Sequence, residues 1–159
     1  RVEALLVEAF LLSRLGAQDK SLKVIEEAEQ LLAQFPPGDD PSCWHARIID
    51  QRGWYYNIQR RSFQEAYEVY QQIPVEGPPF AQIRRLNGLA WSAYKLGRKE
   101  EALFLIRNSV DIAGDAGHLR LRAMALAAWG RFSEEPAIVE RARRMAQRLE
   151  DGELVWRWG

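Results

Sequence analysis

The sequence predicts an all-α fold of about eight helices in antiparallel pairs, and three observations lead to this prediction. Apolar residues recur three or four positions apart over most of the 159-residue chain, which is the spacing of one helix face. Glycine or proline follows most of these stretches, at positions where a helix can end. No stretch of useful length alternates apolar and polar residues, so strands are not expected.

The first pair is predicted from two apolar stripes in the N-terminal part of the chain. The first stripe ends at Gly16 and the second ends near Phe35. The members of the two stripes are Ala4, Leu5, Ala9, Leu12, Leu15, Leu22, Ile25, Ala28, Leu31 and Leu32. The proline-rich segment 36–41 then excludes continued helix, and Asp40 or Ser42 can cap the next one.

The second pair is predicted between residues 42 and 74, where Pro74 ends its second helix. Its apolar stripes consist of Trp44, Ile48, Ile49, Gly53 and Tyr56, followed by Ala66, Val69, Tyr70 and Ile73. The third pair turns at Gly97, which can adopt the left-handed conformation that closes a helix. Its stripes consist of Leu86, Leu89, Ala90, Ala93 and Leu96, followed by Ala102, Ile106, Ser109, Val110 and Ala113.

A fourth pair is predicted around a turn at residues 130–136. Its stripes consist of Leu121, Met124, Ala125, Ala128, Ile138, Ala142, Met145 and Leu149. Small residues open the second helices of the four pairs at Ser21, Ala66, Ala102 and Ala137, at intervals of 45, 36 and 35 residues. The register of the fourth pair stays open, because aligning Arg122 and Trp129 with the earlier pairs conflicts with the spacing of Ala137.

These pairs resemble tetratricopeptide repeats, which are helix-turn-helix units of about 34 residues with a Leu-Gly-x-x-Tyr pattern on the first helix. The stretch from Gly53 to Tyr56 reproduces Gly-x-x-Tyr, and the stretch from Leu89 to Ala93 stands at the same place in the third pair. The resemblance covers repeats at about 2–34, 42–74, 80–114 and 117–150, with a capping tail at 151–159. It implies one domain, 1–159, built as a right-handed superhelical α-solenoid.

Composition and charge are those of a folded protein with no bias toward a charged partner. Hydrophobic residues make up 47% of the chain, and 22 basic residues balance 22 acidic ones. A nucleic-acid ligand is not expected, since its binding depends on an excess of basic groups. No apolar run approaches the roughly 20 residues of a membrane span, and the single cysteine, Cys43, fits a reducing compartment. We therefore predict a cytoplasmic protein that does not bind membranes.

Residues that could carry catalysis or bind a metal form no recognisable constellation. His45 and His118 lie in different repeats and have no Cys, Asp or Glu at the spacing of a zinc site. Nucleotide-binding and serine-hydrolase motifs are absent from the sequence. We therefore expect no catalytic residue, no metal site and no cofactor, and hence a protein that is not an enzyme.

One pattern on the first helices is not required by packing. An Arg-x-x-Asp/Asn-x-x-x-Trp sequence begins at Arg47 and recurs 37 residues later at Arg84. A step of seven residues is two helical turns, so each set lies on one stripe of its helix. In the family that the chain resembles, this face lines a concave groove that binds extended peptides or partner helices. The groove residues predicted in this way are Phe10, Arg47, Asp50, Trp54, Asn57, Arg84, Asn87, Trp91, Tyr94, Lys95 and Trp129.

The groove hypothesis predicts that Trp54 and Trp91 are partly open to solvent. The alternative is that they are packing residues between adjacent pairs. The family's carboxylate clamp is not expected, because Gly88 and Trp91 occupy places where that clamp requires asparagine. The function that we expect is a scaffold for a protein or peptide ligand, within a larger regulatory protein. Alternatives are a homodimer formed through the groove or through Trp156 and Trp158, and an accessory domain of an enzyme.

Overall fold

A computed structural model describes residues 1–34 and 42–150 of the chain, and regular structure in these residues is entirely helical. The helices are α1 Val2–Arg14, α2 Gln18–Leu32, α3 Ser42–Trp54, α4 Phe63–Gln71, α5 Pro79–Lys95, α6 Lys99–Asp115, α7 Leu119–Ser133 and α8 Pro136–Arg148, with a π-helical turn, η1, at Tyr55–Arg60. The all-α class and the number of helices predicted from the sequence are confirmed for this part of the chain. The predicted proline-rich loop, the cap at Asp40 and the C-terminal tail lie outside the described residues.

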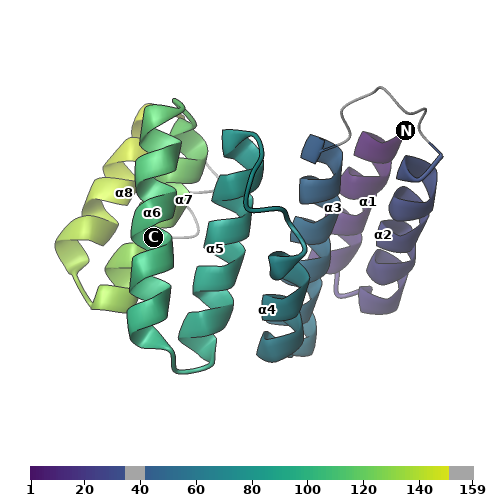
Figure 1. Cartoon of the computed structure of the whole chain (residues 1–159), viewed down its shortest axis with the longest axis horizontal. Helices are drawn as coiled ribbons and strands as arrows, with labels where there is room; N and C mark the ends of the chain where they lie inside the picture. The colour runs from purple at the N-terminus through teal and green to yellow at the C-terminus, as the bar shows by residue number, and fades with distance from the viewer. Residues whose placement is uncertain (35–41, 151–159) are drawn as a thin grey trace.

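Consecutive helices run antiparallel and pack against each other along the whole row (Figure 1). The first helices of successive pairs also contact one another, α1 with α3, α3 with α5, and α5 with α7. Each pair is therefore held both by its own hairpin and by the next pair. None of the helices in residues 1–34 and 42–150 combines the length and the apolar character needed to cross a membrane.

A residue in the left-handed conformation turns the chain between the two helices of each pair. These residues are Gly16 (φ 77°), Arg61 (φ 54°), Gly97 (φ 80°) and Glu134 (φ 60°). The backbone closes around Gly97 through a hydrogen bond of 2.9 Å from the Arg98 N–H to the Ala93 carbonyl. This closure is the Schellman motif, which satisfies carbonyls at the end of the first helix. The four left-handed residues therefore provide a structural alignment of the pairs.

The left-handed residues also settle the register of the fourth pair. The residues five positions after Gly16, Arg61, Gly97 and Glu134 are Ser21, Ala66, Ala102 and Val139, respectively. The first three are almost fully buried, as expected of small residues at a helix crossing. The sequence predicts Ala137 as the fourth member of this set, and that prediction is wrong because Ala137 is exposed.

The predicted turn at residues 130–136 is also corrected by the structure. Helix α7 continues to Ser133, so Gly130 lies within the helix instead of starting a turn. A Cβ atom at Gly130 would lie 2.7 Å from Cγ2 of Val139 and 2.8 Å from the Val139 backbone nitrogen. Gly130 is therefore needed for the close approach of α8 to α7.

Replacing Ala102 by leucine is expected to lower the free energy of unfolding by about 1–3 kcal/mol, because the added carbons overpack a closed crossing. Ala102 is 0% exposed and shares a buried cluster with Ala90 and Ala93 of α5. Urea denaturation measures the change. The control is Ala137→Leu, whose exposed site predicts a change within about 0.5 kcal/mol. An unchanged stability in Ala102→Leu would contradict the alignment of the pairs.

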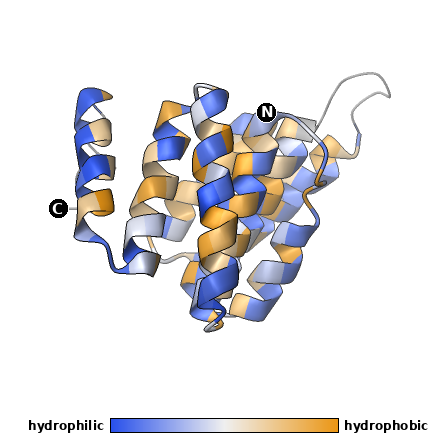
Figure 2. Cartoon of the chain, turned by 60° about the vertical axis from the view of Figure 1, so that its left-hand side comes forward, coloured by the Kyte–Doolittle hydropathy of each residue, from blue (hydrophilic) through white to orange (hydrophobic). Residues whose placement is uncertain are grey.

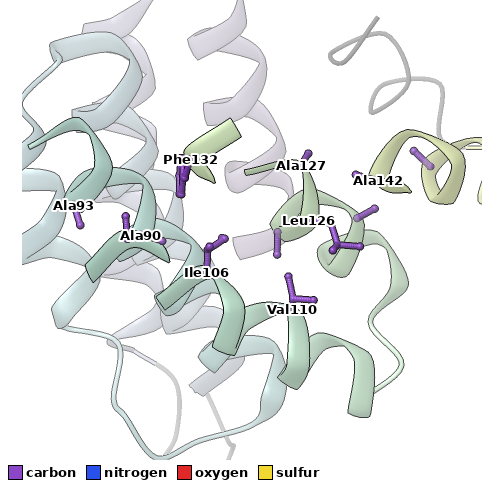
Figure 3. Close-up of a cluster of buried hydrophobic side chains, with 12 residues drawn as sticks. Ala90, Ala93, Ile106, Val110, Leu126, Ala127, Phe132 and Ala142 are labelled. Carbon is purple, nitrogen blue, oxygen red and sulfur yellow. The ribbon is translucent and has the colours of Figure 1, made fainter. Parts of the chain in front are cut away.

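Buried apolar side chains form clusters between successive pairs. The cluster in the C-terminal half joins α5, α6, α7 and α8 and includes Phe132, Ile106 and Leu126 (Figure 3). A second cluster joins α1 and α2 to Ile48 of α3. One smaller cluster lies among α3, α4 and α5, and another lies among α5, α6 and α7. Hydrophobic and hydrophilic residues alternate around the helices, as expected where each helix packs on one side (Figure 2).

Candidate functional site

A cleft of about 620 Å³ opens along the first helices of the pairs. Its walls come from α1, α3, η1, α5 and α7, and Tyr70 of α4 and Ile106 of α6 complete the lining. Neither α2 nor α8 contributes to it. The lining residues are Phe10, Arg14, Asp50, Gln51, Trp54, Asn57, Ile58, Tyr70, Arg84, Asn87, Gly88, Trp91, Ile106, Arg120, Met124, Ala127, Ala128 and Arg131.

Most of the groove residues predicted from the sequence lie together in this cleft. They come from three successive first helices and the π-helical turn, which places them side by side although they span 82 positions. These residues are Phe10, Asp50, Trp54, Asn57, Arg84, Asn87 and Trp91. The helical spacing used to select them therefore identifies one continuous face of the described structure.

Arg47 and Lys95 lie beside the cleft without lining it. Arg47 contributes to a smaller hollow of about 170 Å³ and has its guanidinium 3.5 Å from the Glu3 carboxylate. Lys95 holds its ammonium group 5.3 Å from the centre of the Trp91 ring, as in a cation–π contact. Both residues place positive charge at the edge of the cleft.

Tyr94 and Trp129 are turned toward neighbouring helices instead. The ring of Tyr94 stacks on that of Phe132, with 4.3 Å between their centres. Trp129 packs against the C-terminal core cluster, and the Arg107 guanidinium lies 5.2 Å from its ring centre. The sequence predicts that both residues extend the groove, and the structure places neither of them in the cleft lining.

The alignment of the pairs explains the position of Trp129. Trp91 lies in the cleft and stands six residues before the left-handed Gly97. In the fourth pair the residue six positions before Glu134 is Ala128, and Ala128 lines the cleft. Trp129 is one position further on, which turns it by about 100° around the helix axis.

The π-helical turn η1 brings the second pair into the same alignment. Trp54 stands seven residues before the left-handed Arg61, one more than the six that separate Trp91 from Gly97. A π-helical turn accommodates an extra residue within a helix, and such turns are frequent at functional sites. The insertion at Tyr55–Arg60 thus keeps Trp54 on the cleft face.

Trp91 has a role in packing as well as a place in the cleft. Its side chain is partly exposed, as is that of Trp54, which agrees with the expectation for both residues. The Trp91 ring also lies 5.7 Å from the ring of Phe132, and its indole N–H is buried without a hydrogen-bond acceptor in the described part of the chain. Trp91 therefore packs between the third and fourth pairs and is also partly exposed to the cleft.

An ion pair joins α3 to α5 at the cleft. A guanidinium nitrogen of Arg84 lies 2.7 Å from Oδ2 of Asp50, and the Tyr70 hydroxyl donates to the Asp50 carbonyl oxygen at 3.2 Å. Burial raises the pKa of the Asp50 carboxyl above its usual value, and the Arg84 charge opposes this rise. Burial and the neighbouring Asp50 raise the pKa of Tyr70, so that its phenol stays protonated and can donate.

Replacing Arg84 by methionine is expected to raise the pKa of Asp50 further, because it removes the positive charge that favours the carboxylate. A folded-state pKa above the unfolded value means that the contribution of Asp50 to stability falls as the pH rises through the folded-state pKa. In Arg84→Met this fall still begins near the unfolded-state pKa, but it extends to higher pH and becomes larger. Titration of the Asp50 carboxyl carbon by NMR measures the pKa, and Arg60→Met, an exposed site outside the cleft, is the control. A lower pKa in Arg84→Met would contradict the assigned ion pair.

Two amide side chains in the cleft are held by serines. The Asn57 amide nitrogen donates to Oγ of Ser92 at 3.0 Å, linking η1 to α5. The Asn87 amide oxygen accepts a hydrogen bond of 2.7 Å from Oγ of Ser109, linking α5 to α6. These bonds fix the orientation of both amides before any ligand is present.

Sequence reasoning missed the part of the cleft that α7 provides. Arg120, Met124, Ala128 and Arg131 follow one another at intervals of four, four and three residues, and all of them line the cleft. That helical spacing is the signal that could have identified them. It was hidden because the first and fourth pairs lack the Arg-x-x-Asp/Asn-x-x-x-Trp sequence used to find the face.

Within the described ranges, no three His, Cys, Asp or Glu side chains are grouped so that they could hold a metal ion. No model of a known protein family matches the chain, and no curated protein matches it in sequence.

Proposed function

We propose that this chain is a non-enzymatic scaffold of the tetratricopeptide type, which binds a peptide segment or a helix of a partner protein in the cleft. One observation carries the proposal: the cleft gathers Trp54, Trp91 and Phe10 with four arginines on a surface made by five helical segments. Trp, Tyr and Arg dominate the binding energy of protein interfaces. A volume of about 620 Å³ is large enough to enclose several side chains of a ligand.

The walls of the cleft are held in place without a ligand, which supports binding by a preformed surface. Hydrogen bonds to Ser92 and Ser109 orient the two cleft asparagines, and the ion pair of Arg84 links α3 to α5. A receptor that is already ordered loses little conformational entropy when it binds. The scaffold would therefore present its binding groups rigidly to the partner.

Replacement of Trp91 by alanine should weaken the binding of a true ligand by roughly 2 kcal/mol, the loss typical of an interface hot spot. The probes are synthetic peptides selected on the immobilised chain from a random phage-displayed library, and fluorescence anisotropy measures their affinity. Because Trp91 also packs on Phe132, a second variant, Ile58→Ser, tests the cleft without disturbing the core. Ile58 is 41% exposed and lines the cleft.

The matched control is Val75→Ser, a substitution of an aliphatic residue that is 67% exposed and outside the cleft. The proposal predicts weaker peptide binding in Ile58→Ser and unchanged binding in Val75→Ser, with equal helical content by circular dichroism. It is rejected if no peptide is selected, or if the selected peptides bind Ile58→Ser as tightly as the original chain.

A further inference from the structure

The segment 151–159, which follows the last described residue, is rich in apolar residues. Its sequence is Asp-Gly-Glu-Leu-Val-Trp-Arg-Trp-Gly, so leucine, valine and two tryptophans lie within five consecutive positions. Side chains of this size gain free energy when they are transferred from water to an apolar surface. The described part of the chain offers two neighbouring surfaces for this segment, the outer face of α8 and the cleft.

The outer face of α8 is polar. Between Val139 and Arg148 the exposed side chains are those of Glu140, Arg141, Arg144, Gln147 and Arg148. A terminal helix with a polar outer face needs no further cover. The capping role expected for segment 151–159 would bury charged groups beneath the two tryptophans, which costs desolvation free energy. The chemistry of this face therefore does not match that of the segment.

The cleft offers a surface that does match. Its lining includes the apolar side chains of Phe10, Ile58, Trp91 and Met124. The indole N–H of Trp91 is buried and has no hydrogen-bond acceptor in the described part of the chain. Backbone carbonyls of an extended segment are acceptors of such bonds. An extended, apolar segment can thus bury its side chains in the cleft and also offer acceptors there.

The cleft is within reach of the segment. Helices α7 and α8 are antiparallel and packed together, so α8 ends beside the start of α7 at Leu119 (Figure 1). Met124 lies five residues further, about 8 Å along the axis of α7. The axes of packed helices are roughly 8–10 Å apart, whereas nine extended residues span up to about 32 Å. The segment is therefore long enough to pass around α7 and lie along the cleft.

We propose that segment 151–159 binds in the cleft of its own chain and must be displaced by a partner. This proposal rests on the proposed scaffold function and adds the regulation of the same site. A short tether holds the segment at an effective concentration on the order of 1 mM. An intrinsic Kd of about 0.1 mM is then enough to keep about nine clefts in ten occupied. A partner binds the occupied chain about tenfold more weakly than it binds an open cleft.

The first test uses the full chain and needs no ligand. Trp156→Ser/Trp158→Ser is expected to shift the amide NMR signals of cleft residues, including Ile58 and Met124, and to leave the signals of α2 and of the outer face of α8 in place. The matched control is Phe104→Ser, which removes an aromatic side chain that is 66% exposed on α6 and should not change the cleft signals. Shifts on the outer face of α8 without shifts in the cleft, or no shifts in either, would overturn the proposal.

A second test adds the segment as a separate molecule, a fluorescein-labelled peptide with the sequence of residues 151–159. Fluorescence anisotropy is expected to give a Kd of about 0.1 mM or below for Trp156→Ser/Trp158→Ser. Binding to the original chain should be at least about tenfold weaker, because the attached segment competes. Equal affinity for the two chains would contradict the proposal. Cleft signals that come to match those of the double variant on dilution would assign the segment to a second copy, which also contradicts it.

The peptides selected from the phage-displayed library separate this proposal from the scaffold function. They are expected to bind Trp156→Ser/Trp158→Ser at least about tenfold more tightly than the original chain. Equal binding to both chains, weakened by Ile58→Ser, would overturn the occupied cleft and leave the scaffold function in place. Cleft signals that shift in the double variant, with no selected peptide that binds it, would reject the scaffold function and support the contact between the segment and the cleft.

Discussion

Replacing Tyr70 by alanine is expected to lower the free energy of unfolding by about 3–5 kcal/mol, the loss typical of truncating a buried aromatic residue. Tyr70 belongs to α4 and is 3% exposed. Its ring lies between Gly53 of α3 and Gly88 of α5, where a Cβ atom at either glycine would overlap the ring carbons. The ring therefore fills the space between two first helices, and its removal leaves a cavity at the centre of the row.

A double-mutant cycle between Tyr70 and Gly88 tests this contact directly. Gly88→Ala alone is expected to destabilise the protein by about 1–3 kcal/mol, because the new methyl group overlaps the ring. In the Tyr70→Ala background the same change should stabilise the protein by roughly 0.5–1 kcal/mol, since alanine is the better helix former. The sign of the effect thus depends on the ring.

The control for this cycle is Gly114→Ala in α6, another glycine inside a helix. A Cβ atom there would meet the Cζ atom of Arg122 at 2.9 Å, and this flexible side chain can move aside. Gly114→Ala should therefore change the stability by the same small amount with and without Tyr70. Denaturation by urea measures all the variants, and an equal cost of Gly88→Ala in both backgrounds would show that the ring does not lie on Gly88.

Replacing Phe132 by alanine is expected to cost a similar amount, about 3–5 kcal/mol. Phe132 is 0% exposed and lies in the core cluster of the C-terminal half (Figure 3). Its ring stacks on Tyr94 and also contacts Trp91, so this one side chain of α7 is packed against two aromatic residues of α5. The variant should weaken the contact between the third and fourth pairs.

Phe104→Ala is the matched control for Phe132→Ala, because Phe104 is 66% exposed on α6. Its truncation should change the free energy of unfolding by no more than about 0.5 kcal/mol. Removing the Phe132 ring should also free the Trp91 ring from this contact. Tryptophan fluorescence should then differ from that of the original chain before global unfolding begins. Equal stability of the two variants would place Phe132 outside the core.

The helices themselves were predictable from the sequence because their signals are local. Apolar spacing placed both stripes of the third pair, and Gly97 marked the turn between them, where the structure has a φ of 80°. Arg61 and Glu134 turn the chain in the same conformation without being glycine, so no residue type marked them. The turn of the fourth pair was therefore predicted too early, at Gly130.

The cleft was predictable only in part, for a different physical reason. The spacing of Arg84, Asn87 and Trp91 on one helix is a local property, and it placed these residues on one face. Which neighbouring helix covers a given side chain depends on long-range packing. The residues that pack together in this way are not separated by a constant number of positions, so a single sequence does not reveal them. Tyr94 was therefore assigned to the groove, although Phe132, 38 residues further along, covers its ring.

The central claim, that a partner binds between the first helices, is tested most directly by mapping peptide contacts on the isotope-labelled chain by NMR. Titration with a peptide selected on the immobilised chain is predicted to shift amide signals at the cleft, including those of Gln51, Ile58, Asn87 and Met124. Signals of α2 and α8, which contribute nothing to the cleft lining, are predicted to stay in place. Shifts confined to α2 and α8 would contradict the claim.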